Sequence, residues 1–505
     1  MRGPNNTYAN REDEMTAFTM PSTLPDPVNS DGLAALQAGL ESDLERLGLP
    51  RKAWTAPRRA PDGTTLLDVL VIGAGQFGIG VAAALKLAGI RNFLVIDRAE
   101  EGREGPWVTY ARMPTLRSPK HLPGICFGIP NLTFQSWYRA VYGDAAWEVL
   151  YKIPNQDWQD YILWVRTALA LPVRNGADAI DLRPAPDHVA VVLKSGETLY
   201  AKRVVVASGR TGTGGWTNPP GISPELGPDR LAHTMHDIDF ARLKGKKIAI
   251  IGVGASAFDN AATALEAGAT SVDLFARRPA LPQVNKGRPS SAMGFLEGWQ
   301  SLPDADRWRL GVYLDLMTGV PPHETLLRCL RIPGMKVHFR TKFRSATPTA
   351  TGVQIEIENG PAGEYDFLIL GTGFRVDLAQ EPIFASIYPD IRLWQDAYAP
   401  PEGLERPHLG LHPYLGETCE LQSKSDAPLN RIHLFNMASY MSAGFVAADV
   451  PSLDIAPERL VTGLSQKLFA EDFEPIFESL QAWEDEHELA TTPFYSPDHV
   501  NKSAR

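Results

Sequence analysis

The sequence of 505 residues predicts an α/β fold with two nucleotide-binding βαβ units, one inserted into the other. Two glycine-rich turns predict the units: Gly73-Ala74-Gly75-Gln76-Phe77-Gly78 and Gly252-Val253-Gly254-Ala255-Ser256-Ala257 each follow an apolar run. In Rossmann-type units such glycines make a tight turn that lets the backbone approach a pyrophosphate. The insertion is indicated by two more apolar runs, which stop at Gly209 and Gly373 on either side of the second turn.

The N-terminal segment, residues 1–65, precedes the first unit. Residues 1–30 are rich in charge and turn formers, which is typical of a flexible arm. Leucines spaced by three and four residues predict a helix over 31–48, and several prolines then mark a linker.

The first unit is expected over 66–244. Its glycine turn opens an alanine-rich helix that ends at Gly89, and the next strand ends at Asp97, 24 residues after Gly73. A carboxylate at this place suits a pair of ribose hydroxyls. The expected nucleotide-binding residues of this unit are Gly73, Gly75, Gln76, Phe77, Gly78, Asp97, Arg98 and Gly209.

The second unit is expected over 245–362, with a small helical cap at about 285–335. Its following strand ends in Arg277-Arg278, and guanidinium groups suit a ribose 2′-phosphate, so NADP(H) is favoured over NAD(H). The expected binding residues here are Gly252, Gly254, Ser256, Ala257, Arg277 and Arg278. Residues 363–456 are expected to return to the first unit, with Thr372 and Gly373 near its nucleotide, and a helix and tail follow over 457–505.

Composition excludes several classes of function. A net charge of −10 gives no electrostatic support for a nucleic-acid or anionic-membrane partner. Neither a secretory leader nor a long apolar stretch is evident, so a cytoplasmic protein is expected, and a homo-oligomer is left open. The three cysteines are isolated, which argues against a dithiol reductase, and the histidine spacing predicts no metal site.

These motifs resemble those of the two-dinucleotide flavin-dependent monooxygenases over most of residues 66–450. Gly105-Pro106-Trp107 is similar to a motif of that family, as is Leu370-Gly371-Thr372-Gly373-Phe374, and His233-Thr234 is similar to part of its fingerprint. Asp237 departs from the fingerprint, which expects an aromatic residue there. The resemblance implies FAD in the first unit near Trp107, NADPH in the second, and oxygen transfer from O₂ through a C4a-(hydro)peroxyflavin to a small polar substrate.

The resemblance also indicates candidate catalytic residues. Residues 113–122 are similar to a loop of the amino-acid N-hydroxylase branch that lines the flavin and carries a lysine, which points to Lys120. Asn285 is a second candidate, from its position alone: the loop after the arginine pair is expected to reach the nicotinamide end, where Asn285 would donate or accept a hydrogen bond. A surface lysine and an ordinary polar turn are the alternatives for these two residues.

The substrate stays open at this point. N-hydroxylation of a nitrogen-containing molecule is favoured, ahead of ring hydroxylation of a purine-type (urate-like) substrate and of Baeyer–Villiger oxygen insertion. A non-oxygenating NADPH-flavin reductase or oxidase is the alternative from another class.

Overall fold

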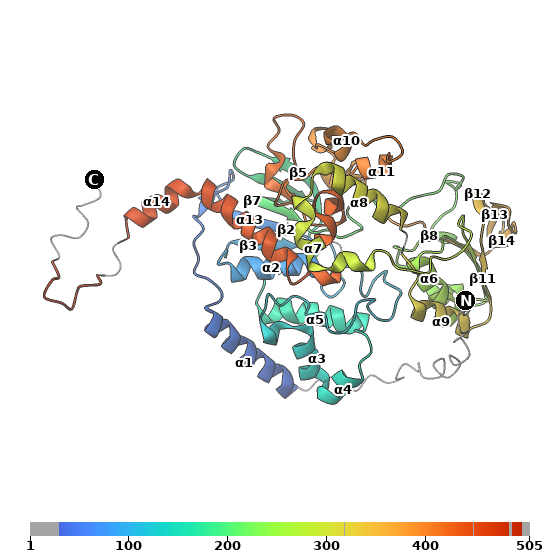
Figure 1. Cartoon of the computed structure of the whole chain (residues 1–505), viewed down its shortest axis with the longest axis horizontal. Helices are drawn as coiled ribbons and strands as arrows, with labels where there is room; N and C mark the ends of the chain where they lie inside the picture. The colour runs from blue at the N-terminus through green and yellow to red at the C-terminus, as the bar shows by residue number, and fades with distance from the viewer. Residues whose placement is uncertain (1–29, 318, 448, 484–486, 497–505) are drawn as a thin grey trace, which may run out of the picture.

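The computed structural model describes residues 30–317, 319–447, 449–483 and 487–496. The arm expected over residues 1–30 lies almost wholly outside them. Two sheets carry the molecule: the first lies at its centre, and the second lies at the end away from the C-terminal helix α14 (Figure 1). Within the described residues no helix is long and apolar enough to cross a membrane.

The first sheet has eight strands in the order β4-β3-β2-β7-β6-β5, with β1 paired to β2 and β16 paired to β7. Strands β2, β3, β4, β7 and β16 run parallel, whereas β5, β6 and the start of β7 form an antiparallel meander. The bounds are β1 Arg58–Arg59, β2 Thr65–Ile72, β3 Phe93–Ile96, β4 Val173–Arg174, β5 Ala179–Pro184, β6 Val189–Leu193, β7 Thr198–Val206 and β16 Ile432–Leu434.

The second sheet is parallel throughout, in the order β11-β10-β9-β15-β8, and a separate meander, β12-β13-β14, follows β11 in the chain. The bounds are β8 Leu231–His233, β9 Lys247–Ile251, β10 Ser271–Phe275, β11 Met335–His338, β12 Lys342–Pro348, β13 Val353–Glu358, β14 Gly363–Tyr365 and β15 Phe367–Leu370. Each unit therefore runs strand, helix, strand, helices, strand, meander and strand.

The second sheet takes up more of the chain than the range 245–362. Strand β8 lies before residue 245, and β15 lies after residue 362, yet both pair within this sheet. The expectation that the run ending at Gly373 returns to the first nucleotide is therefore corrected. Apolar strands that end in glycine look alike in sequence, and only the pairing of β15 with β9 assigns it to the second unit.

Helices cover the sheets and build the cap. In the first unit α2 (Gln76–Leu87) lies under the sheet, with α1 (Ser30–Leu47), α3 (Phe134–Tyr142), α4 (Asp144–Val149) and α5 (Asn155–Ala168) beyond it (Figure 1). In the second unit α9 (His323–Arg331) packs on α6 (Ala255–Glu266), for Cys329 donates to the carbonyl of Phe258. The remaining helices are α7 Met293–Gly298, α8 Asp304–Leu316, α10 Trp394–Ala397, α11 Pro407–Gly410, α12 Tyr440–Ala443, α13 Ala456–Glu471 and α14 Phe473–Gln481.

The cap is smaller than expected. Helix α9 belongs to the second unit, whereas α7 and α8 pack against α12 through a core that contains Trp299, Trp308, Trp394 and Tyr440. Packing therefore explains these aromatic side chains.

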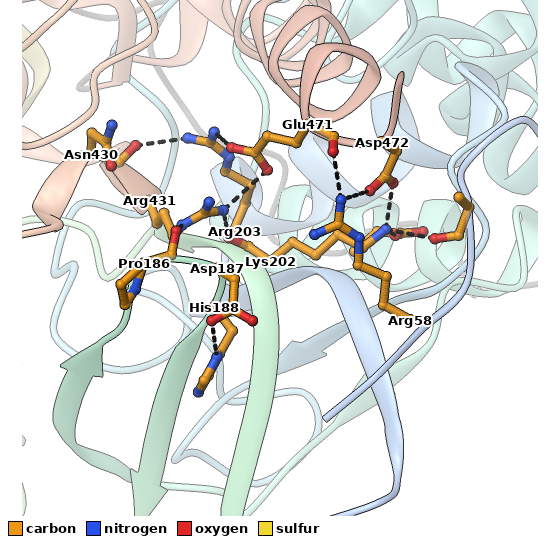
Figure 2. A network of polar contacts seen from close by, with 12 residues as sticks. Arg58, Pro186, Asp187, His188, Lys202, Arg203, Asn430, Arg431, Glu471 and Asp472 are labelled. Atoms are coloured by element: carbon orange, nitrogen blue, oxygen red, sulfur yellow. Dashed lines mark hydrogen bonds and ion pairs between the residues drawn. The ribbon is translucent and has the colours of Figure 1, made fainter. Parts of the chain in front are cut away.

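A buried ion-pair network fastens the end of α13 to the first sheet (Figure 2). Lys202 of β7 is wholly buried, and its Nζ lies 2.6 Å from Asp68 Oδ1 of β2 and 2.6 Å from Asp472 Oδ2 after α13. Arg58 of β1 also contacts Asp472 at 2.7 Å. Since α13 packs on α2 through Pro457 against Gly80, this network holds the helix that supports the first glycine turn.

Candidate cofactor and substrate site

A large cavity of about 1760 Å³ lies where the carboxyl ends of both sheets' strands meet. Ligands of open α/β sheets bind outside the carboxyl ends of the strands. The cavity wall takes in the first glycine turn, the loops after β3 and β7, the start of α6, the loop 285–291, the start of α9 and residues 449–455. Its volume exceeds the 300–1,000 Å³ or so that is typical of a site for one small molecule.

The first glycine turn is shaped to press against β7. Gly73 has φ +107°, and a Cβ there would lie 2.5 Å from the carbonyl oxygen of Ala207. A Cβ on Gly78 would lie 1.7 Å from the carbonyl oxygen of Gly73. Only glycine fits either place, so α2 begins directly behind a bare turn of backbone. The first N–H groups of a helix have no partner within the helix, so the start of α2 is suited to meet an anion.

Asp97 lies beside that turn, at the end of β3. Its Oδ2 accepts the N–H of Ala74 and its Oδ1 accepts the N–H of Ala99, each at 2.7 Å. A carboxylate has about four acceptor positions, so two remain for ribose hydroxyls. Arg98, next to it, is exposed and also lines the cavity.

The other expected residues of the first unit also face the cavity. Gln76 accepts the indole N–H of Trp158 at 3.1 Å, and Phe77 meets Phe435 edge to face at 5.6 Å. Trp107 lines the cavity with its indole nitrogen buried and without a hydrogen-bond partner, and a Cβ on Gly209 would meet no atom within 4 Å. A bare glycine turn, a half-used carboxylate and an unsatisfied buried indole all fit a bound dinucleotide.

The second glycine turn repeats the packing of the first. Gly252 has φ +119°, and a Cβ there would lie 2.3 Å from the carbonyl oxygen of Gly371. Gly254 caps α6 in open space, Ser256 lines the cavity, and Ala257 is buried against Gly371.

The arginine pair after β10 lies outside the cavity. Among the described residues no side-chain hydrogen bond or ion pair engages Arg277 or Arg278, and Arg277 is exposed. Two guanidinium groups without a carboxylate partner are suited to bind a phosphate.

Lys120 is not where the sequence pattern placed it. Its Nζ donates to the carbonyl oxygens of Trp147 at 2.7 Å and Glu148 at 3.3 Å, and lies over the Trp147 ring. The ammonium thus caps the C-terminus of α4, outside the cavity, and an active-site role is not supported. The contact between Lys120 and the end of α4 joins segments 27 residues apart, and no local pattern in the sequence indicates it.

Thr372 and Gly373 also lie outside the cavity. The Thr372 hydroxyl donates to the carbonyl of Thr217 at 2.5 Å, and Phe374 is the residue of this loop that lines the wall. Asn285 does line the cavity, where its Oδ1 accepts the N–H of Gly287 at 3.1 Å. Its part in catalysis stays a prediction.

Sequence reasoning missed the charged side chains that line the cavity between the two units. Arg117 pairs with Asp259 at 2.8 Å, and Lys152 pairs with Glu324 at 2.7 Å. Asp259 lies on α6 one turn after Ser256, and this spacing was the sequence signal that could have placed Asp259 beside the cavity. Burial raises the pKa of another carboxyl on the wall, Glu381, although the N–H of Gly214 donates to it.

The chain is similar in sequence to one protein family and to a protein of known function. Residues 70–292 match the family described as pyridine nucleotide-disulphide oxidoreductase. The chain is 38% identical over 454 residues to the FAD-dependent urate hydroxylase of Xanthomonas campestris pv. campestris, with 88% of this chain and 95% of the relative covered. The chain belongs to the two-dinucleotide flavoprotein monooxygenase family.

Solved structures agree with the fold of this flavoprotein. The ornithine hydroxylase of Pseudomonas aeruginosa matches with a TM-score of 0.62 at 19% identity, over 80% of this chain and all of that one. L-lysine 6-monooxygenase from Pseudomonas syringae matches with a TM-score of 0.62 at 17% identity, over 79% and 99%.

The flavoprotein is therefore a flavin-dependent monooxygenase, and its cofactor is FAD. The glycine turn at Gly73, the free acceptors of Asp97 and the unpaired indole of Trp107 are the residues that fit this cofactor. The match to the disulphide oxidoreductase model does not bring a dithiol with it, because all three cysteines are buried and unpaired. Among the described residues no cluster of side chains is suited to hold a metal ion.

Proposed function

We propose that this flavoprotein uses NADPH and O₂ to hydroxylate the ring of urate or a closely related oxidised purine. The observation that carries the proposal is the 38% identity to a urate hydroxylase, because it extends over nearly the whole of both chains. The solved N-hydroxylases share the fold at under 20% identity, and fold alone does not assign a substrate. The order of preference from the sequence is thus reversed, with purine-ring hydroxylation ahead of N-hydroxylation.

The chain's own residues bind and orient the reactants. FAD, when bound, supplies the redox and oxygen chemistry. The turn at Gly73 and the start of α2 suit its pyrophosphate, Asp97 suits its ribose, and Trp107 has an indole N–H to donate. The apolar side chains of Leu116, Leu122 and Phe445 on the wall exclude water from the reacting region.

NADPH is supported by the free arginine pair. Arg277 and Arg278 follow the second strand of the second unit, at the place where a ribose 2′-substituent lies in such folds. The start of α6, open at Gly254, suits the pyrophosphate, and Asn285 and Ser256 suit the nicotinamide end in the cavity.

The test is to follow NADPH oxidation by the purified yellow protein in air, with urate, ornithine, lysine and cadaverine as candidate substrates. We expect urate to stimulate NADPH consumption and to be consumed with it in equal amounts. Stimulation by an amine and none by urate would contradict the purine proposal and favour N-hydroxylation. Peroxide formation that is equally fast with every compound would favour an oxidase.

A further inference from the structure

The two units meet along a seam that is crossed by ion pairs of one polarity. Arg103, Arg112, Arg117 and Lys152 come from the loops of the first unit, whereas Asp237, Asp259 and Glu324 follow β8 or lie on α6 and α9 of the second. Every pair in this seam therefore joins a cation of the first unit to an anion of the second. All but Asp237 also line the cavity.

The inner part of the seam contains its more buried ion pairs. The carboxylate of Asp259 is almost wholly buried, and its two oxygens have different partners, Arg117 at 2.8 Å and the hydroxyl of Thr325 at 2.8 Å. Glu324, the residue before Thr325, accepts from Lys152 at 2.7 Å and from the hydroxyl of Tyr151 at 2.9 Å. The first turn of α9 is thus linked to two loops of the first unit: directly to the loop 150–153, and through Asp259 to the loop that carries Arg117.

The outer part of the seam adds weaker contacts. Asp237 is 71% exposed and lies 3.3 Å from Arg103 and 3.6 Å from Arg112. Arg328 of α9 donates to the carbonyl of Arg112 at 3.3 Å. Complementary charges across an interface mainly set register and orientation, and exposed pairs contribute little binding energy of their own.

The seam lies between the two nucleotide sites. The glycine turn at Gly73 belongs to one unit and that at Gly252 to the other, so the relative position of the units sets the distance between the two cofactor rings. Reacting atoms must come within about 3–3.5 Å, and a misplacement of about 1 Å costs on the order of 100-fold in rate. Interfaces between domains move by default unless they are large and apolar, and this seam is crossed by charged side chains.

We propose that Arg117, Lys152, Asp259 and Glu324 are positioning residues for flavin reduction, which hold the second unit so that the nicotinamide meets the flavin. The proposal rests on the proposed use of NADPH. None of the four side chains touches the hydride in transfer, and each acts by keeping the seam in register.

The test uses the FAD-loaded enzyme with Lys152→Met, Glu324→Gln and Asp259→Asn. Lys246→Met is the matched control, because Lys246 pairs with Asp366 at 3.2 Å within the second unit and away from the seam. Anaerobic stopped-flow gives the rate of flavin reduction at saturating NADPH. We expect a decrease of about threefold for Lys152→Met and Glu324→Gln and about tenfold for Asp259→Asn, and no change for the control. The double swap Lys152→Glu with Glu324→Lys restores the rate to within about twofold of wild type.

Hydrogen exchange provides a readout that needs no NADPH. In Lys152→Met the amides of the loop 150–153 and of the first turn of α9 exchange faster, and in the control they do not. If the variants reduce flavin and exchange like the control, the seam inference is wrong while the proposed function stands. If NADPH fails to reduce the wild-type flavin, the proposed function is wrong, and unchanged exchange in the seam variants would still overturn the inference separately.

Discussion

Replacing Lys202 with methionine tests the network that fastens α13 to the first sheet (Figure 2). The ammonium has three partners: Asp68, Asp472 and the carbonyl of Ala56, at 2.6, 2.6 and 2.7 Å. Asp472 keeps Arg58 at 2.7 Å, but Asp68 is 1% exposed and loses its cation. Removal of one partner from a buried pair costs about 3–5 kcal/mol, so we expect a loss of that size in the free energy of unfolding.

The loss depends on pH with a definite sign. Burial already raises the pKa of Asp68, and loss of the ammonium raises it further. A carboxyl with a raised pKa in the folded state stabilises the fold less as pH rises, so the penalty is smaller at pH 5 than at pH 8.

Urea unfolding at pH 5 and pH 8, followed by near-ultraviolet circular dichroism, measures this effect. The double variant Lys202→Met with Asp68→Asn is the control, and it should recover a large part of the loss, because no charge is then buried without a partner. A single variant within 1 kcal/mol or so of wild type at both pH values would refute the reasoning.

Three further predictions concern the first glycine turn, the arginine pair after β10 and the buried carboxyl of Asp157. Gly73→Ala places a Cβ 2.5 Å from the carbonyl oxygen of Ala207, on a residue with φ +107°. The purified variant should therefore carry little FAD, measured by its visible absorbance. A variant with a full complement of FAD would contradict the role of the first glycine turn. Arg277→Ala with Arg278→Ala should raise the KM for NADPH about tenfold or more and leave that for NADH unchanged, which steady-state kinetics with both nucleotides will decide. Burial raises the pKa of Asp157 to about 6, so wild-type stability falls by up to about 3 kcal/mol as pH rises from about 4 to 6. Asp157→Asn should lack that fall in thermal melts across the same range, and an unchanged pH dependence would contradict the assignment.

Much of the nucleotide-binding architecture was predictable because it depends on local rules. A glycine turn between an apolar strand and a helix requires close backbone approach, and the contacts of Gly73 and Gly252 confirm this packing. The helix predicted at 31–48 is confirmed as α1.

The rest depends on contacts between distant segments. The pairing of β15 with β9 and the capping of α4 by Lys120 leave no local pattern in the sequence. The same holds for Arg117 and Asp259, which are 142 residues apart and meet only because two units dock. Substrate preference likewise lies in loops from both units, so the resemblance alone favoured N-hydroxylation where a nearly full-length relative favours a purine.

The central proposal is that this flavoprotein hydroxylates a purine ring with one oxygen atom from O₂ and with electrons from NADPH. The most direct measurement is turnover of urate under ¹⁸O₂ with NADPH, followed by mass spectrometry of the product. The account predicts one ¹⁸O atom in each product molecule and one NADPH consumed for each urate. Product that carries oxygen only from water, or NADPH consumption that yields peroxide and leaves urate unchanged, would contradict it.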